Sequence, residues 1–216
     1  MAEYKGIHGT KVQNYTSDPD NAITGQVWYN ETDQVLKFQY PTVTTAGSWR
    51  TGNSMNTARS GSGGAGTQTA ALVFGGSGPP TTGATEKYDG TSWTEVNDLT
   101  TARVSVTGAG TQTSALAFGG ETTVPTGATE SYNGTSWTEV NDMNTARSQG
   151  GGSGVQTSAL AYAGEPPDNT RNLTESWNGT NWTEVADLSV PRNGAGGNAG
   201  VSNTSALCFG GGGPNP

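Results

Sequence analysis

The side chains that could carry acid–base or metal chemistry are few. His8 is the single histidine and Cys208 the single cysteine, so neither a Cys/His metal set nor a Ser-His-Asp triad can be assembled. Cys208 aligns with small apolar residues of the other repeats, which predicts a buried free thiol. Carboxylate pairs such as Glu95 and Asp98 could serve glycoside hydrolysis, but they recur along the chain and nothing marks a unique pair. We therefore expect a protein that is not an enzyme and that has no metal and no cofactor.

The composition of the 216 residues argues against several classes of protein. A formal net charge of −8 with 10 basic residues leaves no basic stripe, so we expect no nucleic-acid binding. No apolar run approaches the length of a membrane span, and residues 1–8 lack the apolar region of a secretory signal peptide. We therefore expect synthesis in a cytoplasm and no membrane insertion. The 31% hydrophobic content is low, but six tryptophans and a strict repeat argue against disorder.

One stretch recurs almost unchanged along the chain. In residues 113–137 a short apolar run closed by two glycines is followed by a loop, a Glu-x-Tyr segment and a tryptophan. Two series have spacings of 44, 44 and 45: the tryptophans Trp49, Trp93, Trp137 and Trp182, and the arginines Arg59, Arg103, Arg147 and Arg192. A period near 44 is typical of a propeller blade with four strands. Short apolar runs between Gly-, Thr-, Asn- and Ser-rich turns, without helical spacing, predict an all-β fold.

Each repeat can be divided into four strands: a Gly-rich strand a, an Ala-Leu-x-Phe strand b, a Glu-x-Tyr strand c, and a strand d that begins at the tryptophan. After Arg192 the chain provides only a and b, and before Arg59 only c, near residues 35–40, and d, at Trp49. We therefore predict a small propeller of four blades, each with four antiparallel strands, closed by pairing the N- and C-terminal fragments in one blade. An open ring, or a ring completed by another subunit, is the alternative.

These features resemble the kelch repeat. Its Gly-Gly pair, tyrosine turn, tryptophan and arginine occur here, in that order, as Gly119-Gly120, Tyr132-Asn133, Trp137 and Arg147. The resemblance implies a kelch-like β-propeller over residues 34–216. The sequence departs from the pattern in its Gly-rich strand a, in Ala163, which replaces the first glycine of one pair, and in Pro191. Residues 1–33 would form an N-terminal docking segment, and the alternation in residues 26–30 and 34–40 predicts a hairpin.

Residues that recur in every blade are more easily explained by structure than by function. We expect the arginines and tryptophans of the two series to be structural, with Arg103 pairing Glu86 or Glu130 and the tryptophans packing between blades. Stacking of sugars on the tryptophans is the alternative. The glycines of strand a, as in residues 61–66 and 150–154, are expected to let backbones approach closely near the axis.

The connections between strands b and c differ most from repeat to repeat. They span residues 77–83, 121–127, 165–172 and 212–216, and each contains proline, which stiffens a loop by fixing φ. Stiff loops on a regular scaffold are typical recognition sites, although they could equally be connectors that tolerate many sequences. The candidate binding residues are Pro79, Pro80, Thr81, Thr123, Pro125, Pro166, Pro167, Asp168 and Arg171.

The leader gives a second resemblance. Residues 7–11, followed by residues 23–37 with their Gly-x-x-Trp-Tyr-Asn segment, are similar to the start of structural proteins of tailed bacteriophages, especially marine ones. This implies a virion component of the tail, neck or fibre, made in the host cytoplasm and present as a homo-oligomer. Its partners would be other virion proteins, through the N-terminal segment, and a glycan or protein of the host surface. A kelch interaction scaffold and a lectin-like propeller are the alternatives.

Overall fold

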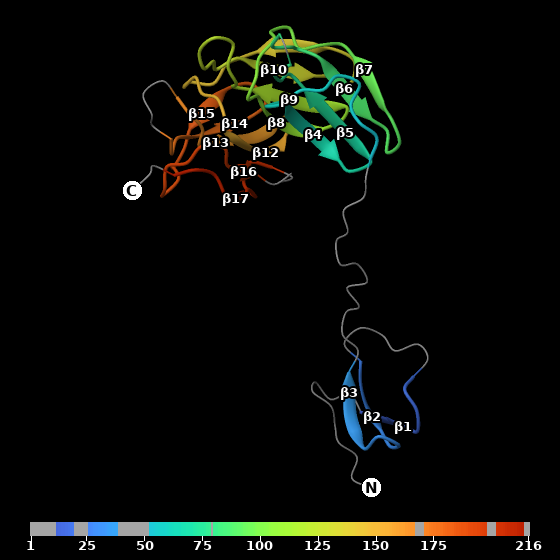
Figure 1. Ribbon diagram of the computed structural model, residues 1–216. Helices are drawn as coiled ribbons and strands as arrows, with labels where there is room; N and C mark the ends of the chain where they lie inside the picture. The colour runs from blue at the N-terminus through green and yellow to red at the C-terminus, as the bar shows by residue number, and fades with distance from the viewer. Residues whose placement is uncertain are drawn as a thin grey trace. The chain divides into compact units, whose positions relative to one another are not determined.

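The chain forms strands and turns, and no residue that the structure describes is helical. The computed structural model describes residues 12–19, 26–38, 52–78, 80–166, 171–197 and 202–213. It divides into two compact units, Met1–Thr51 and Gly52–Pro216, which we treat separately (Figure 1). The all-β prediction is confirmed for this part of the chain. None of its segments forms a helix long and apolar enough to cross a membrane.

The first unit contains one small sheet in the order β1-β2-β3. Its strands are β1 (Gln13–Tyr15), β2 (Val27–Asn30) and β3 (Val35–Phe38). β2 and β3 are antiparallel, which confirms the predicted hairpin, whereas β1 is parallel to β2. The Asp18 carboxylate accepts hydrogen bonds from Trp28, Asn30 and Lys37 and so ties the segment after β1 to the hairpin. The predicted domain boundary, between residues 33 and 34, lies in the turn of this hairpin.

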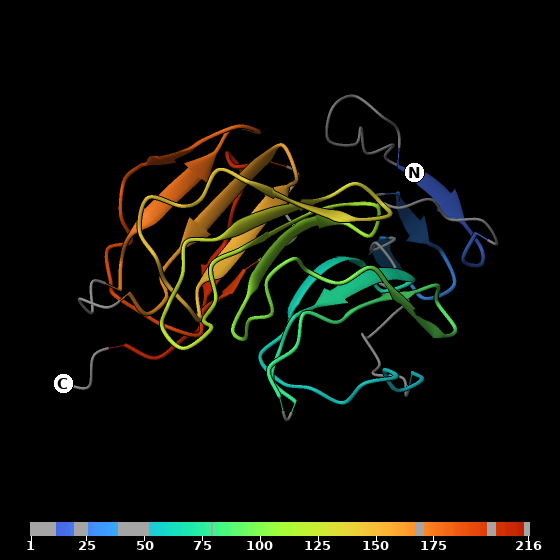
Figure 2. The same cartoon turned by 90° about the horizontal axis from the view of Figure 1, so that it is seen from above.

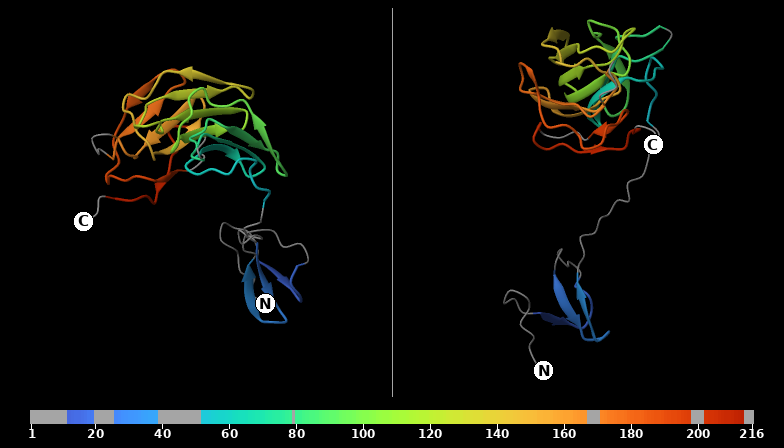
Figure 3. Two further views of the ribbon diagram at one scale, coloured as in Figure 1. Left: turned by 45° about the horizontal axis from the view of Figure 1, so that its top comes forward. Right: turned by 90° about the vertical axis from the view of Figure 1, so that its left-hand side faces the viewer.

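The second unit contains three antiparallel sheets of four strands, each formed by consecutive segments. The strands are β4 (Gly63–Thr67), β5 (Ala70–Phe74), β6 (Thr85–Tyr88) and β7 (Trp93–Val96) in the first sheet, β8 (Thr107–Thr111), β9 (Ser114–Phe118), β10 (Thr129–Tyr132) and β11 (Trp137–Val140) in the second, and β12 (Gly151–Val155), β13 (Ser158–Tyr162), β14 (Thr174–Trp177) and β15 (Trp182–Glu184) in the third. The sheets follow one another side by side in chain order, as blades of a propeller do (Figures 2 and 3). This arrangement matches the four strands predicted for each complete repeat.

In the described residues, the fourth repeat contains only two strands. β16 (Gly196–Gly197) pairs with β17 (Cys208–Phe209), and these strands correspond to strands a and b of the complete sheets. The N-terminal segment predicted as strand c of this blade is found as β3, which pairs with β2. Trp49, predicted to begin strand d, lies outside the described residues. Closure of the ring and the number of blades therefore stay predictions.

The first strands of neighbouring sheets approach each other through glycine. A Cβ atom on Gly108 of β8 would lie 2.3 Å from the Gly64 carbonyl oxygen of β4, and one on Gly197 would lie 2.3 Å from the Gly152 carbonyl oxygen. No side chain fits at such a distance, so glycine is required where the backbones of two sheets meet. The close approach expected from the Gly-rich strands is confirmed. The second strands supply the apolar core, in which Leu72, Phe74, Leu116 and Phe118 are buried.

Candidate binding surface and the scaffold that carries it

The loops between strands b and c are fixed at their base by backbone contacts. In the loop before β10, Glu121 forms β-bridges with Val104 and Pro125, and the Thr126 N–H donates to the Gly120 carbonyl at 2.9 Å. The loop before β6 repeats the pattern with the bridges Ser60–Ser77 and Ser77–Thr81 and the bond from Thr82 to Gly76. Because the same positions are bonded in both loops, the sheets hold their loops in equivalent places.

The candidate binding residues differ in exposure. Pro80 and Thr123 are exposed, whereas Pro166 is buried and has little surface to offer a partner. Between Thr123 and Pro125, Val124 is 63% exposed and is the apolar tip of its loop, which the sequence analysis did not single out. Thr81, Pro125 and Arg171 are half-buried, and Pro79, Pro167 and Asp168 lie outside the described residues.

The third loop has a polar contact of its own. Arg171 Nη2 lies 2.7 Å from Glu165 Oε1, and both side chains remain partly exposed. The Arg171 carbonyl accepts the Arg192 N–H at 3.0 Å, which ties this loop to the start of the fourth repeat. The structure thus brings Arg171 to the base of its loop and not to the tip.

Three of the recurring arginines, Arg59, Arg103 and Arg147, pair with glutamates inside their own sheet, whereas Arg192 donates to the Gly210 carbonyl. Arg103 Nη2 lies 3.2 Å from Glu130 Oε1, with both side chains at most 1% exposed, and the pairs Arg59–Glu86 and Arg147–Glu175 repeat this contact at 3.1 and 2.9 Å. The sequence left open whether Glu86 or Glu130 pairs with Arg103, and the structure assigns Glu130. Burial lowers the pKa of the Arg103 guanidinium, and the charge of Glu130 opposes this shift. The predicted ion pair is therefore present and is deeply buried.

The same glutamates hold the turn that precedes the arginine. Glu130 Oε2 accepts the Thr100 N–H at 2.7 Å, and Glu130 Oε1 accepts the Thr101 N–H at 3.4 Å. Glu86 and Glu175 bond the equivalent turns at Asn56-Thr57 and Asn144-Thr145. A carboxylate that satisfies backbone donors as well as a cation is well compensated for its burial. Its role is structural in all three sheets.

Trp137 and Trp182 fill the space between successive sheets, whereas Trp93 is partly exposed and packs against Tyr88 of its own sheet. The rings of Trp137 and Phe74 meet edge to face at 4.8 Å, and Trp137 Nε1 donates to Thr85 Oγ1 at 3.1 Å. Trp182 makes the same two contacts with Phe118 and Thr129. Packing between blades is therefore confirmed for Trp137 and Trp182, which are each 5% exposed. Such burial leaves no ring face on which a sugar could stack.

A further series of contacts between sheets comes from the turn after strand a. Gln112 Nε2 donates to the Ala71 and Tyr88 carbonyls of the preceding sheet. Gln156 in the third sheet donates to Ala115 and Tyr132 in the same way. Asn203 takes this position in the fourth repeat and donates to the Ser176 hydroxyl. Sequence reasoning missed these residues because a polar side chain in a turn has no distinctive pattern.

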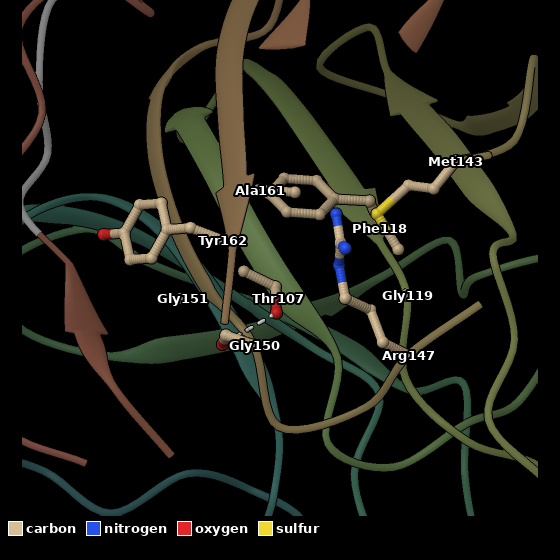
Figure 4. A pocket seen from close by; sticks show the side chains of 9 residues that line it. All are labelled: Thr107, Phe118, Gly119, Met143, Arg147, Gly150, Gly151, Ala161 and Tyr162. Carbon is tan, nitrogen blue, oxygen red and sulfur yellow. Dashed lines mark hydrogen bonds between the residues drawn. The ribbon is translucent and has the colours of Figure 1, made fainter. Parts of the chain in front are cut away.

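The space between the second and third sheets is closed by side chains. Figure 4 shows the Arg147 guanidinium beside the Phe118 ring and Met143, between strands of the two sheets. Thr107 Oγ1 donates to the Gly150 carbonyl at 3.0 Å across the same contact. These groups belong to the packing, and no volume remains there for a ligand.

A cavity of about 280 Å³ lies along the first strands β4, β8 and β12. It is lined chiefly by glycine and alanine, with Ser153 as the single polar side chain of its lining. No titratable group of the described residues borders it. Nor do the described residues contain a group of three or more His, Cys, Asp or Glu side chains that could hold a metal ion.

Comparisons with known proteins do not assign the chain to a family. No family model matches it, and no curated protein matches it significantly.

Proposed function

We propose that this chain is a non-enzymatic structural protein of a tailed-phage particle, a small propeller of the tail, neck or fibre that presents its b–c loops to the host surface. The observation that carries the proposal is the use of the recurring polar groups. Three buried arginine–glutamate pairs hold their own sheets, and the glutamines of the repeat bond the preceding sheet, so these recurring polar groups serve the scaffold. The connections between strands b and c differ most between repeats, which suits display on a rigid scaffold.

In this proposal the array is a four-bladed, kelch-like ring, with β16 and β17 as the inner half of the fourth blade. Closure by residues 34–49 of the same chain is one way to complete it, and completion by another polypeptide is the second. The N-terminal sheet would dock the propeller to other virion proteins. Its exposed apolar side chains, Val27, Leu36 and Phe38, suit such a contact because exposed apolar patches mark interaction sites.

A kelch-like interaction scaffold outside a virus is the second candidate. It is favoured by Val124, which is 63% exposed at a loop tip, because an apolar tip suits contact with a protein better than contact with a glycan. A lectin is less favoured because Trp137, Trp177 and Trp182 are buried, which leaves the partly exposed Trp93 as the tryptophan of the described repeats that a sugar could reach.

Peptide mass spectrometry of purified virus particles from the source culture tests the proposal. We expect the protein in the particles, at a copy number that is a multiple of three, five, six or twelve, as the symmetry of a tail, vertex or neck requires. Absence from particles, with free protein in the host or medium, would overturn the virion role and favour the scaffold. Deleting residues 1–30 should prevent incorporation into particles while the propeller still folds.

A further inference from the structure

The outer edge of β17 differs from the matching edge in every complete sheet. In those sheets strand b is covered by strand c, and Phe74, Phe118 and Tyr162 are at most 2% exposed. The equivalent residue of β17, Phe209, is 53% exposed, and Leu207 is 61% exposed. Strand b of the fourth repeat therefore has the sequence of a central strand but the exposure of an edge strand. An exposed apolar edge is a template for pairing with a further strand.

The complete sheets define what that further strand must carry. In each complete sheet, a glutamate of strand c lies directly opposite the residue that follows the leucine of strand b, which is Val73, Ala117 or Ala161. Its carboxylate forms an ion pair with Nη2 of the arginine and accepts hydrogen bonds from the N–H groups two and three residues before that arginine, as Arg103, Thr101 and Thr100 show.

The fourth repeat contains the arginine and the two backbone N–H groups of this site, but no carboxylate for them to bind among the described residues. Cys208 takes the position of Ala117. The residues Arg192, Val190 and Ser189 take the positions of Arg103, Thr101 and Thr100. Arg192 Nη1 donates to the Gly210 carbonyl at 2.9 Å. In the complete sheets it is the other terminal nitrogen, Nη2, that contacts the glutamate. No glutamate of the described residues lies opposite Cys208. The edge of β17 therefore favours a strand that carries a carboxylate opposite Cys208.

The chain's own N-terminal residues are poor candidates for this strand. Val35–Phe38 pairs with β2. Counting back by the repeat of 44 from Thr85 and Glu86 gives Pro41 and Thr42. Proline lacks the N–H that a central strand needs, and threonine lacks the carboxylate.

We propose that the edge of β17 that no described strand covers binds a β-hairpin of a partner polypeptide with the sequence Thr-Glu-x-aromatic, followed five residues later by tryptophan. The hairpin adds strands c and d to the half-blade by backbone pairing, as in other cases of strand addition. Its glutamate binds Arg192 and the two N–H groups, and its aromatic side chains cover the outer half of the blade. The inference selects and specifies the second of the two ways of completing the ring that are named above, and it does not depend on where the protein is located.

The first test uses the intact chain and a labelled synthetic peptide of residues 128–140, whose sequence fits this description. Fluorescence anisotropy should show saturable binding, weakened at least about 10-fold by Glu130→Gln in the peptide or by Arg192→Ala in the chain, as expected for a hydrogen-bonded charge. Lys87→Ala removes an exposed cation from another sheet and should leave the affinity unchanged. Equal affinity of the Glu and Gln peptides, or no binding, would overturn the proposal.

The second test fixes the register with the native thiol, which is free. Residues directly opposite on antiparallel strands have Cα atoms about 4.5 to 5.5 Å apart, within the range of a disulfide. With oxidised glutathione as oxidant, the Glu130→Cys peptide should form a disulfide with Cys208, whereas the Ser131→Cys peptide, whose side chain points to the other face, should not. A Thr42→Cys chain that forms this disulfide within a monomer would overturn the proposal and show that the ring closes within one chain.

Discussion

A buried ion pair that recurs in each sheet raises the question of what it contributes to the fold. Arg103 and Glu130 are almost fully buried, and two backbone N–H groups also donate to the carboxylate. Removing one partner from such a pair leaves a buried charge, which typically costs about 3 to 5 kcal/mol, whereas removing both costs less than the sum. The pair thus selects one arrangement of the turn before strand a and one position of strand c.

The first prediction follows from this contrast. Arg103→Met should lower the free energy of unfolding by about 3 kcal/mol, and Arg103→Met combined with Glu130→Gln should recover part of the loss. Arg171→Met is the matched control, because the Arg171–Glu165 pair has similar geometry but is partly exposed, and should cost less than about 1 kcal/mol. Urea unfolding followed by tryptophan fluorescence measures all three. Equal losses for Arg103→Met and Arg171→Met would show that burial of the pair does not matter.

The second prediction concerns Tyr162, at the contact between the third sheet and the half-blade. Burial raises its pKa to about 12, from an ordinary value of 10.0, and the charge of Cys208 adds to this shift. Because the folded state holds the proton more tightly, this stabilisation is complete below pH 10 and is lost as the pH rises towards 12. The loss should reach about 2 to 3 kcal/mol for a shift of this size.

Denaturant unfolding of the wild type and of Tyr162→Phe across this pH range provides the measurement. The variant lacks the titrating hydroxyl, so its unfolding free energy should fall less steeply than that of the wild type. Parallel pH profiles for the two proteins would show that the buried hydroxyl does not control stability in alkali.

Among the elements, the Gly-rich first strands differ from the other strands because they need glycine where the backbones of two sheets meet. The third prediction compares two glycines that face each other across the first and second sheets. On Gly108 a Cβ atom would lie 2.3 Å from the Gly64 carbonyl oxygen and 2.7 Å from the Phe74 ring, whereas on Gly64 the nearest atom would be 3.6 Å away. Gly108→Ala should therefore force the sheets apart and cost about 3 kcal/mol or more.

Gly64→Ala is the control, since it meets only ordinary contacts and restricts the unfolded chain. It should change stability by no more than about 0.5 kcal/mol in either direction. Thermal unfolding followed by circular dichroism compares both variants with the wild type. Equal melting temperatures for the Gly108→Ala and Gly64→Ala variants would show that the first strands do not touch in solution as the structure describes.

The four-strand division of each complete repeat could be predicted from sequence because its signals are local. The glycine runs, the Ala-Leu-x-Phe segments and the tryptophans mark strands a, b and d, and all three sheets follow them. Contacts between repeats could not be predicted in the same way. The spacing alone does not tell whether Arg103 pairs with Glu86 or Glu130, or that Gln112 reaches the preceding sheet, because both depend on how successive sheets stack.

The candidate binding residues show a similar limit. Comparing the repeats located the variable loops, and the described parts of three of them lie between strands b and c as predicted. Exposure within a loop depends on how the loop folds at its base, so Pro166 is buried while the apolar Val124 stands out. Proline content predicted stiff connections but not which side chain would reach solvent.

At the scale of the whole molecule, the chain consists of two compact units, and the fourth prediction concerns their independence. The unit Gly52–Pro216 contains the three complete sheets and the half-blade, with its own buried core. We expect a fragment of residues 52–216 to fold alone and to melt at the same temperature as this unit in the full chain. Removing residues 1–51 also removes Trp28 and Trp49, so the remaining tryptophan fluorescence reports this unit alone.

The comparison also bears on how the fourth blade is completed. If residues 34–51 supplied strands c and d, deleting them would uncover β17 and lower the melting temperature of the fragment. Hydrogen exchange at the amide of Cys208, which takes the position of Val73 facing strand c, would then be faster in the fragment than in the full chain, because an edge amide loses its acceptor. With an edge that is open to a partner hairpin, exchange should be equally fast in both proteins and should slow only when the peptide of residues 128–140 is added.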